Sequence, residues 1–254
     1  MPVATVELKS PKEIALMREA GSIVAYTLRV LSEHAQPGIT TAELDKIAAS
    51  EIAKKGALPA FLNYRGFPAT LCVSVNDEVV HGIPKADKVL KNGDIVSLDF
   101  GVIVKGYFAD AAVTVPVGKV TPQVQQLVTA TKQSLEKGID QMHPDKRIGD
   151  ISSAVQAWVE AKGFSVVRSF VGHGIGRALH EDPPVPNFGR AGTGLRLAPG
   201  MVLAVEPMVN LGSHDVRILD DGWTAVTRDG KWSAHFEHTI AVTQDGPEIL
   251  TVER

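Results

Sequence analysis

Cysteine is nearly absent from this chain. Cys72 is the one cysteine among 254 residues, so no disulfide can form within the chain, and this suits a reducing compartment. Long apolar runs are absent as well, and a transmembrane helix needs about 18 consecutive apolar residues. Residues 1–10 lack the charged and then apolar pattern of an export signal. These absences predict a cytoplasmic protein.

Neither sign of charge dominates the sequence. There are 26 lysines and arginines against 29 aspartates and glutamates, which gives a formal net charge of −3. A nucleic-acid site or a membrane-binding surface usually needs a basic excess, so neither partner is predicted. With 44% hydrophobic residues and no low-complexity segment, the chain can bury a large core. Its length allows one large domain or two small ones.

Capping motifs in the sequence predict where the first two helices begin. Ser10-Pro-Lys-Glu13 and Thr40-Thr-Ala-Glu43 are capping boxes, and apolar residues at helical spacing follow the first of them. Further helix starts and β-rich runs follow along the chain. Helices are expected to about residue 34, from 40 to about 55, from 121 to just before Gly138 and from about 150 to 163, and strands at 71–75, 95–117, 165–171, 201–206, 217–219, 224–227 and 235–243.

A faint internal repeat is visible at an offset of 107 residues. Leu44 falls on Ile151 and Ile52 falls on Val159, and each half of the chain reads as two helices followed by strands. Matches of this size also arise by chance, so duplication and coincidence both stay open. A duplication predicts an α+β fold, with two related halves packed around one central antiparallel sheet and a site in the cleft between them.

The segment from Asp99 to Asp110 predicts a β-hairpin. It is rich in β-branched and aromatic residues, and Lys105-Gly106 supplies a turn near its middle. Folding the chain at the midpoint sets Asp99 opposite Asp110, with Cβ atoms roughly 4.5–5.5 Å apart. Two carboxylates at that distance repel unless they share a proton or hold a cation. The pair therefore predicts a metal site, with a surface pair as the alternative.

Three more residues have the chemistry of metal ligands. His173 lies between two glycines, which leave its imidazole uncrowded, although a flexible loop with a surface histidine also explains it. Glu206 ends an apolar strand, and Glu237 lies within another. A charged group among apolar neighbours needs a partner, which either an arginine or a metal ion can supply.

Taken together, these five residues favour the metal interpretation. Four clustered carboxylates are untenable unless cations balance them, and two divalent ions cancel a formal charge of −4. Oxygen-rich ligation with one nitrogen suits Mn, Fe, Co or Zn, and Mg less obviously. The residues alone therefore predict a dinuclear hydrolase. Two further histidines, His81 and His180, lie beside turns at predicted strand ends, where catalytic groups collect, and a structural role is the alternative for each.

At these residues the chain resembles the type I methionine aminopeptidases, members of the pita-bread metallopeptidases (family M24). The likeness covers nearly the whole chain and implies one catalytic domain, residues 1–254, with the α+β pita-bread fold of two pseudo-symmetric halves around a central antiparallel sheet. The matching segments are SVNDEVVHGIP (74–84), SLDFG (97–101), GYFAD (106–110), GHGIGRALHE (172–181), AVEPMV (204–209), DGWTAVTRDG (221–230) and HFEHT (235–239).

The resemblance implies removal of the initiator methionine from the N-termini of nascent polypeptides, with a small second residue preferred. It implies that His81 and His180 hold the substrate and stabilise the tetrahedral intermediate or the leaving amine. Glu206 would also accept a proton. The ligands of two divalent metal ions (Co, Mn, Fe or Zn) would be Asp99, Asp110, His173, Glu206 and Glu237.

The same resemblance implies a pocket for the methionine side chain. Polarizable sulfur favours aromatic edges, although ordinary core packing is the alternative for each residue concerned. Phe61 and Leu179 stand where better-known members carry a cysteine and a phenylalanine, and Phe67 replaces a common tyrosine. These exchanges keep the pocket apolar. The implied lining residues are Tyr64, Phe67, Cys72 and Trp223.

Two competing interpretations share the pita-bread fold. Proline-directed relatives, prolidase or aminopeptidase P, have the same ligand set, but they usually carry an added N-terminal domain and lack a segment like residues 221–230. Non-enzymatic binding modules typically lose metal ligands, whereas all five are present here. Ribosome contact and a monomeric state are implied by the resemblance alone.

Overall fold

The first two helices confirm the capping signals. The computed structural model describes residues 6–254, so residues 1–5 of the stretch inspected for an export signal lie outside it. Helices α1 (Pro11–His34) and α2 (Thr41–Lys54) both begin with complete capping boxes. In each box the cap hydroxyl accepts a hydrogen bond from the backbone N–H three residues on, and that glutamate bonds back to the cap.

The third helix does not end where the sequence predicted. α3 (Pro122–Ile139) runs through Gly138, and α4 (Ile148–Ala161) packs against it. A Cβ atom built on Gly138 would lie 2.9 Å from Cγ2 of Val155. The glycine therefore allows two helices to approach closely and does not end the helix. A close approach between helices far apart in sequence leaves no local signal.

The predicted hairpin is present, but its register differs. β4 (Ile95–Val104) and β5 (Tyr107–Pro116) are joined at Lys105-Gly106, both with positive φ. Asp99 pairs with Ala112, and Asp110 pairs with Gly101, so the prediction that the two aspartates oppose each other is wrong. The turn is centred one residue later than the midpoint, which moves the pairing by two residues. Because side chains alternate with a period of two, both carboxylates stay on the same face.

The remaining strands are short. The predicted strand at 165–171 is reduced to two residues, and the predicted strand at 235–243 is interrupted at Phe236-Glu237. Six strands had no prediction: β1, β3, β7, β8, β10 and β15. The bounds are β1 Leu58–Pro59, β2 Leu71–Val75, β3 Glu78–Val80, β6 Ser165–Val166, β7 Gly172–Gly174, β8 Glu181–Val185, β9 Val202–Val205, β10 Met208–Asn210, β11 Val216–Ile218, β12 Ala225–Thr227, β13 Ser233–His235, β14 His238–Thr243 and β15 Gly246–Ile249, with a 3-10 turn, η1, at Tyr64–Gly66.

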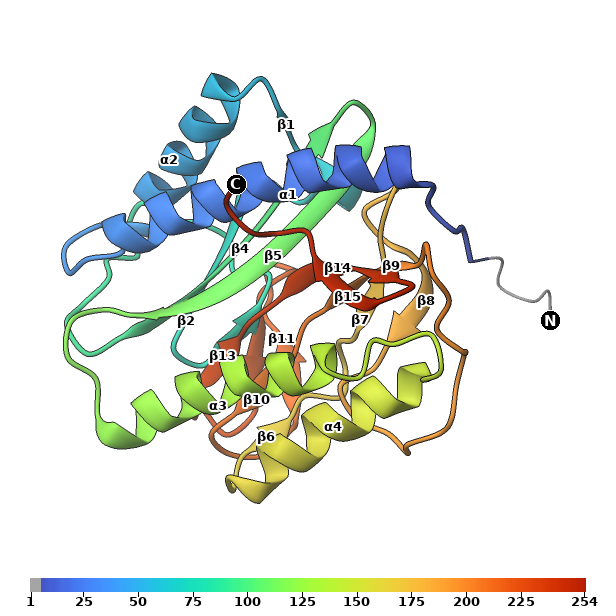
Figure 1. Cartoon of the computed structure of the whole chain (residues 1–254). Helices are drawn as coiled ribbons and strands as arrows, with labels where there is room; N and C mark the ends of the chain where they lie inside the picture. Colours follow the sequence, from blue (N-terminus) through green and yellow to red (C-terminus); the bar gives the residue numbers. More distant parts are fainter. Residues whose placement is uncertain (1–5) are drawn as a thin grey trace.

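Within residues 6–254 every strand pairing is antiparallel, and the pairs form four sheets. Their strand orders are β1-β4-β2 with β5 beside β4, β13-β10-β6, β11-β12-β3 and β15-β14-β9-β7-β8. α1 and α2 lie in the upper half of Figure 1, and α3 and α4 lie in the lower half, with strands between and behind them. Two halves of helices and antiparallel strands make up the pita-bread fold.

Each half has its own apolar core. Leu28 and Phe100 belong to the cluster beneath α1 and α2, while Leu127 and Ile151 belong to the cluster beneath α3 and α4. A third cluster contains Met17 together with buried residues from both halves. Most members of these clusters are almost fully buried, and each such side chain stabilises the fold by about 1.5–3 kcal/mol. The third cluster contains the aromatic residues implied to bind methionine.

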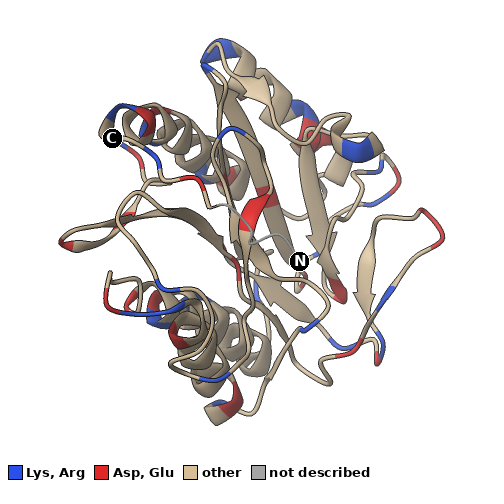
Figure 2. Cartoon of the chain, turned by 90° about the vertical axis from the view of Figure 1, so that its right-hand side faces the viewer, with Lys and Arg blue, Asp and Glu red and all other residues tan. Residues whose placement is uncertain are grey.

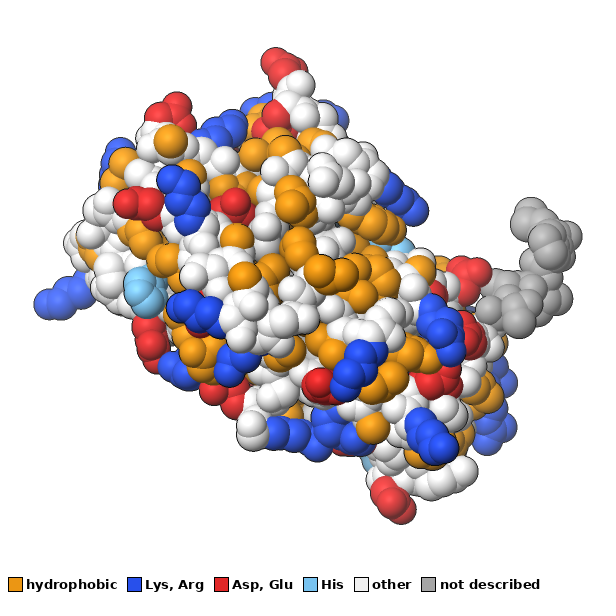
Figure 3. Space-filling view, turned by 90° about the horizontal axis from the view of Figure 1, so that it is seen from above, with side chains coloured by type: hydrophobic (Ala, Val, Ile, Leu, Met, Phe, Trp, Pro, Cys, Tyr) orange, Lys and Arg blue, Asp and Glu red, His pale blue; other side chains and the backbone are white. Residues whose placement is uncertain are grey.

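The surface carries charges of both signs. In Figure 2 the Lys, Arg, Asp and Glu positions alternate over the helices and loops, and some acidic positions lie on central strands. The face seen from above in Figure 3 mixes apolar side chains with charged ones of both signs. Among the described residues, no helix has both the length and the apolar character needed to cross a membrane.

Candidate active site and metal centre

One pocket brings together every residue that the sequence singled out as functional. Its walls include the five implied metal ligands, the two additional histidines and the four residues implied to bind methionine. Phe61 and Leu179, the other two exchanged positions beside Phe67, also line it. Arg65 lines it too, although no sequence motif had marked this residue. Residues from both halves of the fold contribute, so the pocket exists only when the halves are packed together.

Backbone pairing sets the spacing of the first carboxylates. Cys72 pairs with Asp99, which pairs with Ala112, and Ala112 forms a bridge with Glu237. The bridge consists of two hydrogen bonds, 2.9 Å from Glu237 N to Ala112 O and 3.3 Å from Ala112 N to Glu237 O. Directly paired residues project from the same face. Asp99 and Glu237 therefore stand on either side of Ala112, whose methyl group leaves room between them.

A second row of backbone pairs carries the histidine. His173 pairs with Ala204, and Ala204 pairs with Thr239. The hydroxyl of Thr239 accepts a hydrogen bond from Asp110 N at 3.1 Å, and it lies 2.7 Å from Asp110 O and 3.1 Å from Asp110 Oδ1. Thr239, part of the HFEHT segment, therefore fixes the Asp110 side chain. The sequence prediction gave it no role.

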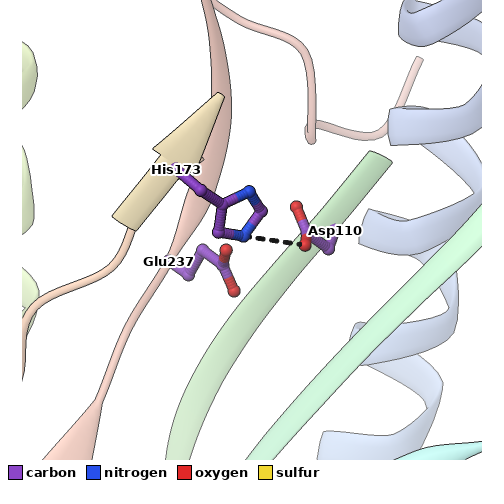
Figure 4. Close-up of side chains that lie close together, drawn as sticks. All are labelled: Asp110, His173 and Glu237. Carbon is purple, nitrogen blue, oxygen red and sulfur yellow. Dashed lines mark ion pairs between the residues drawn. The ribbon is translucent and has the colours of Figure 1, made fainter. Parts of the chain in front are cut away.

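His173 is oriented to offer a lone pair to a metal ion. Its Nδ1 donates a hydrogen bond to the carbonyl oxygen of Gly174 at 2.9 Å, which leaves Nε2 as the acceptor. Nε2 lies 3.7 Å from Asp110 Oδ2 and 3.5 Å from Glu206 Oε1. Possible ligand atoms of Asp110, His173 and Glu237 lie within 4.8 Å of one another. Figure 4 shows these three side chains gathered together. These separations exceed a hydrogen bond and leave space for an ion.

Burial makes the carboxyl groups costly to ionise in the absence of a cation. It raises the pKa of Asp110 to about 7 and lifts the pKa values of Asp99, Glu206 and Glu237 well above their ordinary range, where neighbouring carboxylates raise them further. Oδ1 of Asp99 is buried without a hydrogen-bond partner among residues 6–254. Two buried carboxyl groups, two that are largely buried and an unpartnered oxygen fit divalent cations, which would balance the charge and complete the contacts.

The two additional histidines lie at the rim of the carboxylate cluster. Burial lowers the pKa values of His81 and His180 to about 4, so both rings are neutral at pH 7. His180 Nδ1 lies 2.9 Å from the hydroxyl of Tyr64, which stacks on the ring, and His180 is 4.2 Å from the His173 ring centroid. His81 has φ of 60°, a left-handed conformation in which its ring meets the edge of Trp223.

The apolar end of the pocket is built from aromatic edges. Phe67 and Trp223 meet edge to face with ring centroids 5.2 Å apart. Cys72 is buried beside them in the same cluster, and burial raises the pKa of its thiol well above the ordinary value. A protonated, buried thiol behaves as a small apolar group. Cys72 therefore forms part of the pocket wall and is not a nucleophile.

A buried histidine that the sequence prediction did not mark lies behind Glu206. His235 is 1% exposed, and its Nε2 has no hydrogen-bond partner in the described part of the chain. That atom is 3.9 Å from Oε2 of Glu206. Burial lowers the pKa of His235 to about 3, so the ring is neutral. His235 lies two residues before Glu237, so the HFEHT segment contains it without indicating this position behind Glu206.

The fold and the carboxylate-rich pocket are those of a metallopeptidase. Residues 15–244 match metallopeptidase family M24. The chain is 56% identical to a methionine aminopeptidase of Clostridium perfringens and 54% identical to methionine aminopeptidase 1 of Bacillus subtilis, over 96% of this chain and 98% of each relative. The crystal structure of methionine aminopeptidase from Thermotoga maritima superposes with a TM-score of 0.97 at 48% identity, covering 98% of this chain and all of that one.

The chain therefore belongs to metallopeptidase family M24, in its methionine aminopeptidase group. The resemblance and the fold class stated from the sequence are confirmed. An Xaa-Pro dipeptidase from Bacillus anthracis also superposes, with a TM-score of 0.76, but at 23% identity, and this chain covers only 62% of it. That likeness shows the shared fold alone and does not favour the proline-directed alternative.

Proposed function

We propose that the protein removes the N-terminal methionine from nascent polypeptides by metal-assisted hydrolysis, and that it prefers a small second residue. One observation carries the proposal. The carboxylates and His173 share a single pocket with an apolar end lined by Phe67 and Trp223. A methionine side chain in that end would place the first peptide bond of the substrate over the carboxylates. Relatives at 45–56% identity that are named methionine aminopeptidases support this substrate.

The metal would be two divalent ions, Co, Mn, Fe or Zn. When bound, such ions polarise a carbonyl group and lower the pKa of water toward neutrality. Thr239 would keep Asp110 in its ligating orientation, and Gly174 would keep the Nε2 lone pair of His173 directed at the site. The residues that would hold the ions are Asp99, Asp110, His173, Glu206 and Glu237.

Side chains of the protein itself would transfer the proton of the attacking water and hold the peptide in position. Glu206 lies at the side of the pocket nearest His173 and would accept the proton lost by the attacking water. His81 and His180 are neutral and would hold the peptide and its tetrahedral intermediate through hydrogen bonds. The hydroxyl of Tyr64 would hold the His180 ring in place. The aromatic edges, together with Cys72, would exclude water from around the methionine thioether.

The proposed substrate also indicates where in the cell the protein acts. Nascent chains emerge in the cytoplasm, where we place the protein as a monomer that contacts the ribosome transiently. The single cysteine is in keeping with that compartment. One catalytic domain would carry the whole activity, because the pocket takes residues from both halves.

The decisive experiment is peptide hydrolysis by chelator-stripped protein before and after addition of Co or Mn. Met-Ala-Ser should release methionine only with metal, and Leu-Ala-Ser and Ala-Pro-Ser should stay intact. Cleavage of Ala-Pro-Ser in place of Met-Ala-Ser would move the protein to the proline-directed peptidases. No turnover of any of the three, in protein that is folded and loaded with metal, would favour a non-enzymatic binding module.

A further inference from the structure

Arg65 lies at the pocket and has no carboxylate partner among residues 6–254. Among the residues that line the pocket in the described part of the chain, it is the one lysine or arginine. Its side chain is exposed, and within residues 6–254 its one specific contact is with the ring of Tyr64, 5.4 Å from guanidinium carbon to ring centroid. Four other arginines are paired with carboxylates, for example Arg18 with Glu248 at 2.8 Å, but these pairs lie outside the pocket. The guanidinium of Arg65 is therefore free to bind something else.

The backbone holds Arg65 in place at a conformational cost. Asn63 and Arg65 have φ of 64° and 50°, the left-handed region that non-glycine residues rarely adopt. The turn is closed by hydrogen bonds from Tyr64 N to Phe61 O at 2.9 Å and from Asn63 N to Phe67 O at 2.8 Å. Strained backbone that the surroundings hold in place is concentrated at functional sites. Here it presents a fixed cation beside the pocket.

Neighbouring contacts locate that cation relative to the proposed reaction. Tyr64 bonds to Nδ1 of His180, and Arg65 follows Tyr64 directly. Arg65 and His180 also line the same pocket. If the substrate's N-terminal methionine enters toward the carboxylates, the rest of the peptide leaves past His180. Arg65 would then face the residues that follow the scissile bond.

We propose that Arg65 forms a subsite for a carboxylate on the part of the peptide beyond the scissile bond, so that an acidic third residue accelerates hydrolysis. This inference rests on the proposed function. The planar guanidinium fork matches a carboxylate through two parallel hydrogen bonds. Such a carboxylate can come from an aspartate or glutamate side chain or from the C-terminus of a short peptide. An arginine in this role would select among substrates that all carry methionine and a small second residue.

The test compares C-terminally amidated peptides, which have no terminal carboxylate. Met-Ala-Glu-Gly, Met-Ala-Gln-Gly and Met-Ala-Lys-Gly amides are hydrolysed by metal-loaded full-length protein, and kcat/KM is measured at low and high salt. An exposed ion pair predicts a preference for Glu over Gln of about two- to fivefold, with Lys slowest, and a smaller preference at high salt. A Met-Ala-Ser free acid against its amide measures the contribution of a terminal carboxylate.

Variants assign the preference to Arg65. Arg65→Gln should reduce the Glu/Gln ratio to about one, Arg65→Lys should keep part of it, and Arg65→Glu should favour the Lys peptide. Arg190→Gln makes the same charge change at an exposed position outside the pocket and should keep the wild-type ratio. Melting temperatures verify that each variant is folded.

Two results would overturn the subsite. One is equal hydrolysis of the Glu, Gln and Lys peptides by the wild type, and the other is an unchanged ratio in Arg65→Gln. Either would leave the proposed function intact, because methionine would still be released. Absence of methionine release from all peptides would overturn the proposed function, and the subsite with it.

Discussion

Lys9 and Glu181 form a buried ion pair across 172 positions of sequence, with Nζ 2.6 Å from Oε2. The side chain of Lys9 is 1% exposed. The other oxygen of Glu181 accepts hydrogen bonds from the backbone N–H groups of Arg177 and Ala178, at 2.7 and 3.0 Å. The pair thus ties the residues before α1 to the loop that carries His180.

Lys9→Met should destabilise the protein by about 3 kcal/mol, because it leaves the carboxylate of Glu181 partly buried without its cation. It should also lower kcat, since the loop with His180 loses its anchor, while bound metal stays at the wild-type level. Urea denaturation, turnover and metal analysis measure the three effects. Lys105→Met is the matched control, because its pair with Glu19 is exposed and should be worth at most about 1 kcal/mol. If Lys9→Met kept the wild-type stability and kcat, the proposal that this ion pair anchors the His180 loop would be wrong.

Asp110→Ala and Glu237→Ala should each lose bound metal and activity together. Both residues belong to the group of possible ligand atoms that lie within 4.8 Å of one another, so either loss would remove a proposed ligand. We expect activity to fall more than about 100-fold, beyond the 10- to 100-fold typical of residues that only support a ligand. Metal analysis after dialysis and turnover of Met-Ala-Ser measure it, with the exposed Glu33→Ala as control. Full activity in either variant would exclude the dinuclear arrangement.

His180→Ala should lower turnover by about 100-fold or more while metal content stays nearly intact, since His180 acts on the substrate in the proposed mechanism. Tyr64→Phe removes only the hydroxyl that lies 2.9 Å from His180 Nδ1, so a smaller loss of about three- to tenfold is expected. Both are measured as kcat with stoichiometric metal determination. Should His180→Ala lose its metal, the residue would have to be reassigned as a ligand.

Metal-free protein should lose stability as pH rises above about 6.5. In the folded state the pKa of Asp110 is about 7, and those of three neighbouring carboxyl groups are well above their ordinary range. The folded protein then binds more protons than the unfolded chain, so its free energy of unfolding falls as pH rises toward these values. Buried histidines with pKa values of about 3 or 4 act in the opposite direction, but only below about 6.5, where unfolded imidazole is protonated.

Urea denaturation of chelator-stripped protein between about pH 6.5 and pH 8 measures this loss. The expected slope is on the order of 1 kcal/mol per pH unit for each carboxyl group that the folded protein keeps protonated. Saturating Mn should remove the pH dependence, because a bound cation stabilises the ionised carboxylates and binds only the folded protein. A metal-free protein that is equally stable across this range would contradict the raised pKa values.

Sequence motifs predicted the features that depend on contacts between residues close together in the chain. Ser10 and Glu13 cap α1 through contacts within four residues, so the helix start was readable, and the apolar spacing that follows it was readable too. That the five proposed ligands lie together in one pocket was predictable, because carboxylates among apolar neighbours need a partner. The hairpin register was off by two residues, since it depends on where the turn at Lys105-Gly106 is centred, which a midpoint does not fix.

Features that depend on contacts between residues far apart in the chain left no recognisable pattern in the sequence. Gly138 is explained by α4, and Lys9 by a loop more than 160 residues away. The unpredicted strands β3 and β10 have three residues each, too few to show alternation, and they exist because other strands pair with them. Arg65 resembles any surface arginine until the fold places it at the pocket.

Ala112 lies between Asp99 and Glu237 in one row of backbone pairs, and Ala204 lies between His173 and Thr239 in the other. They take no part in the chemistry, yet their small size creates the space that an ion can occupy. A leucine at position 112 would extend its branched side chain between Asp99 and Glu237, and it would block binding of an ion there. The site therefore depends on two small side chains that carry no charge as well as on the charged groups around them.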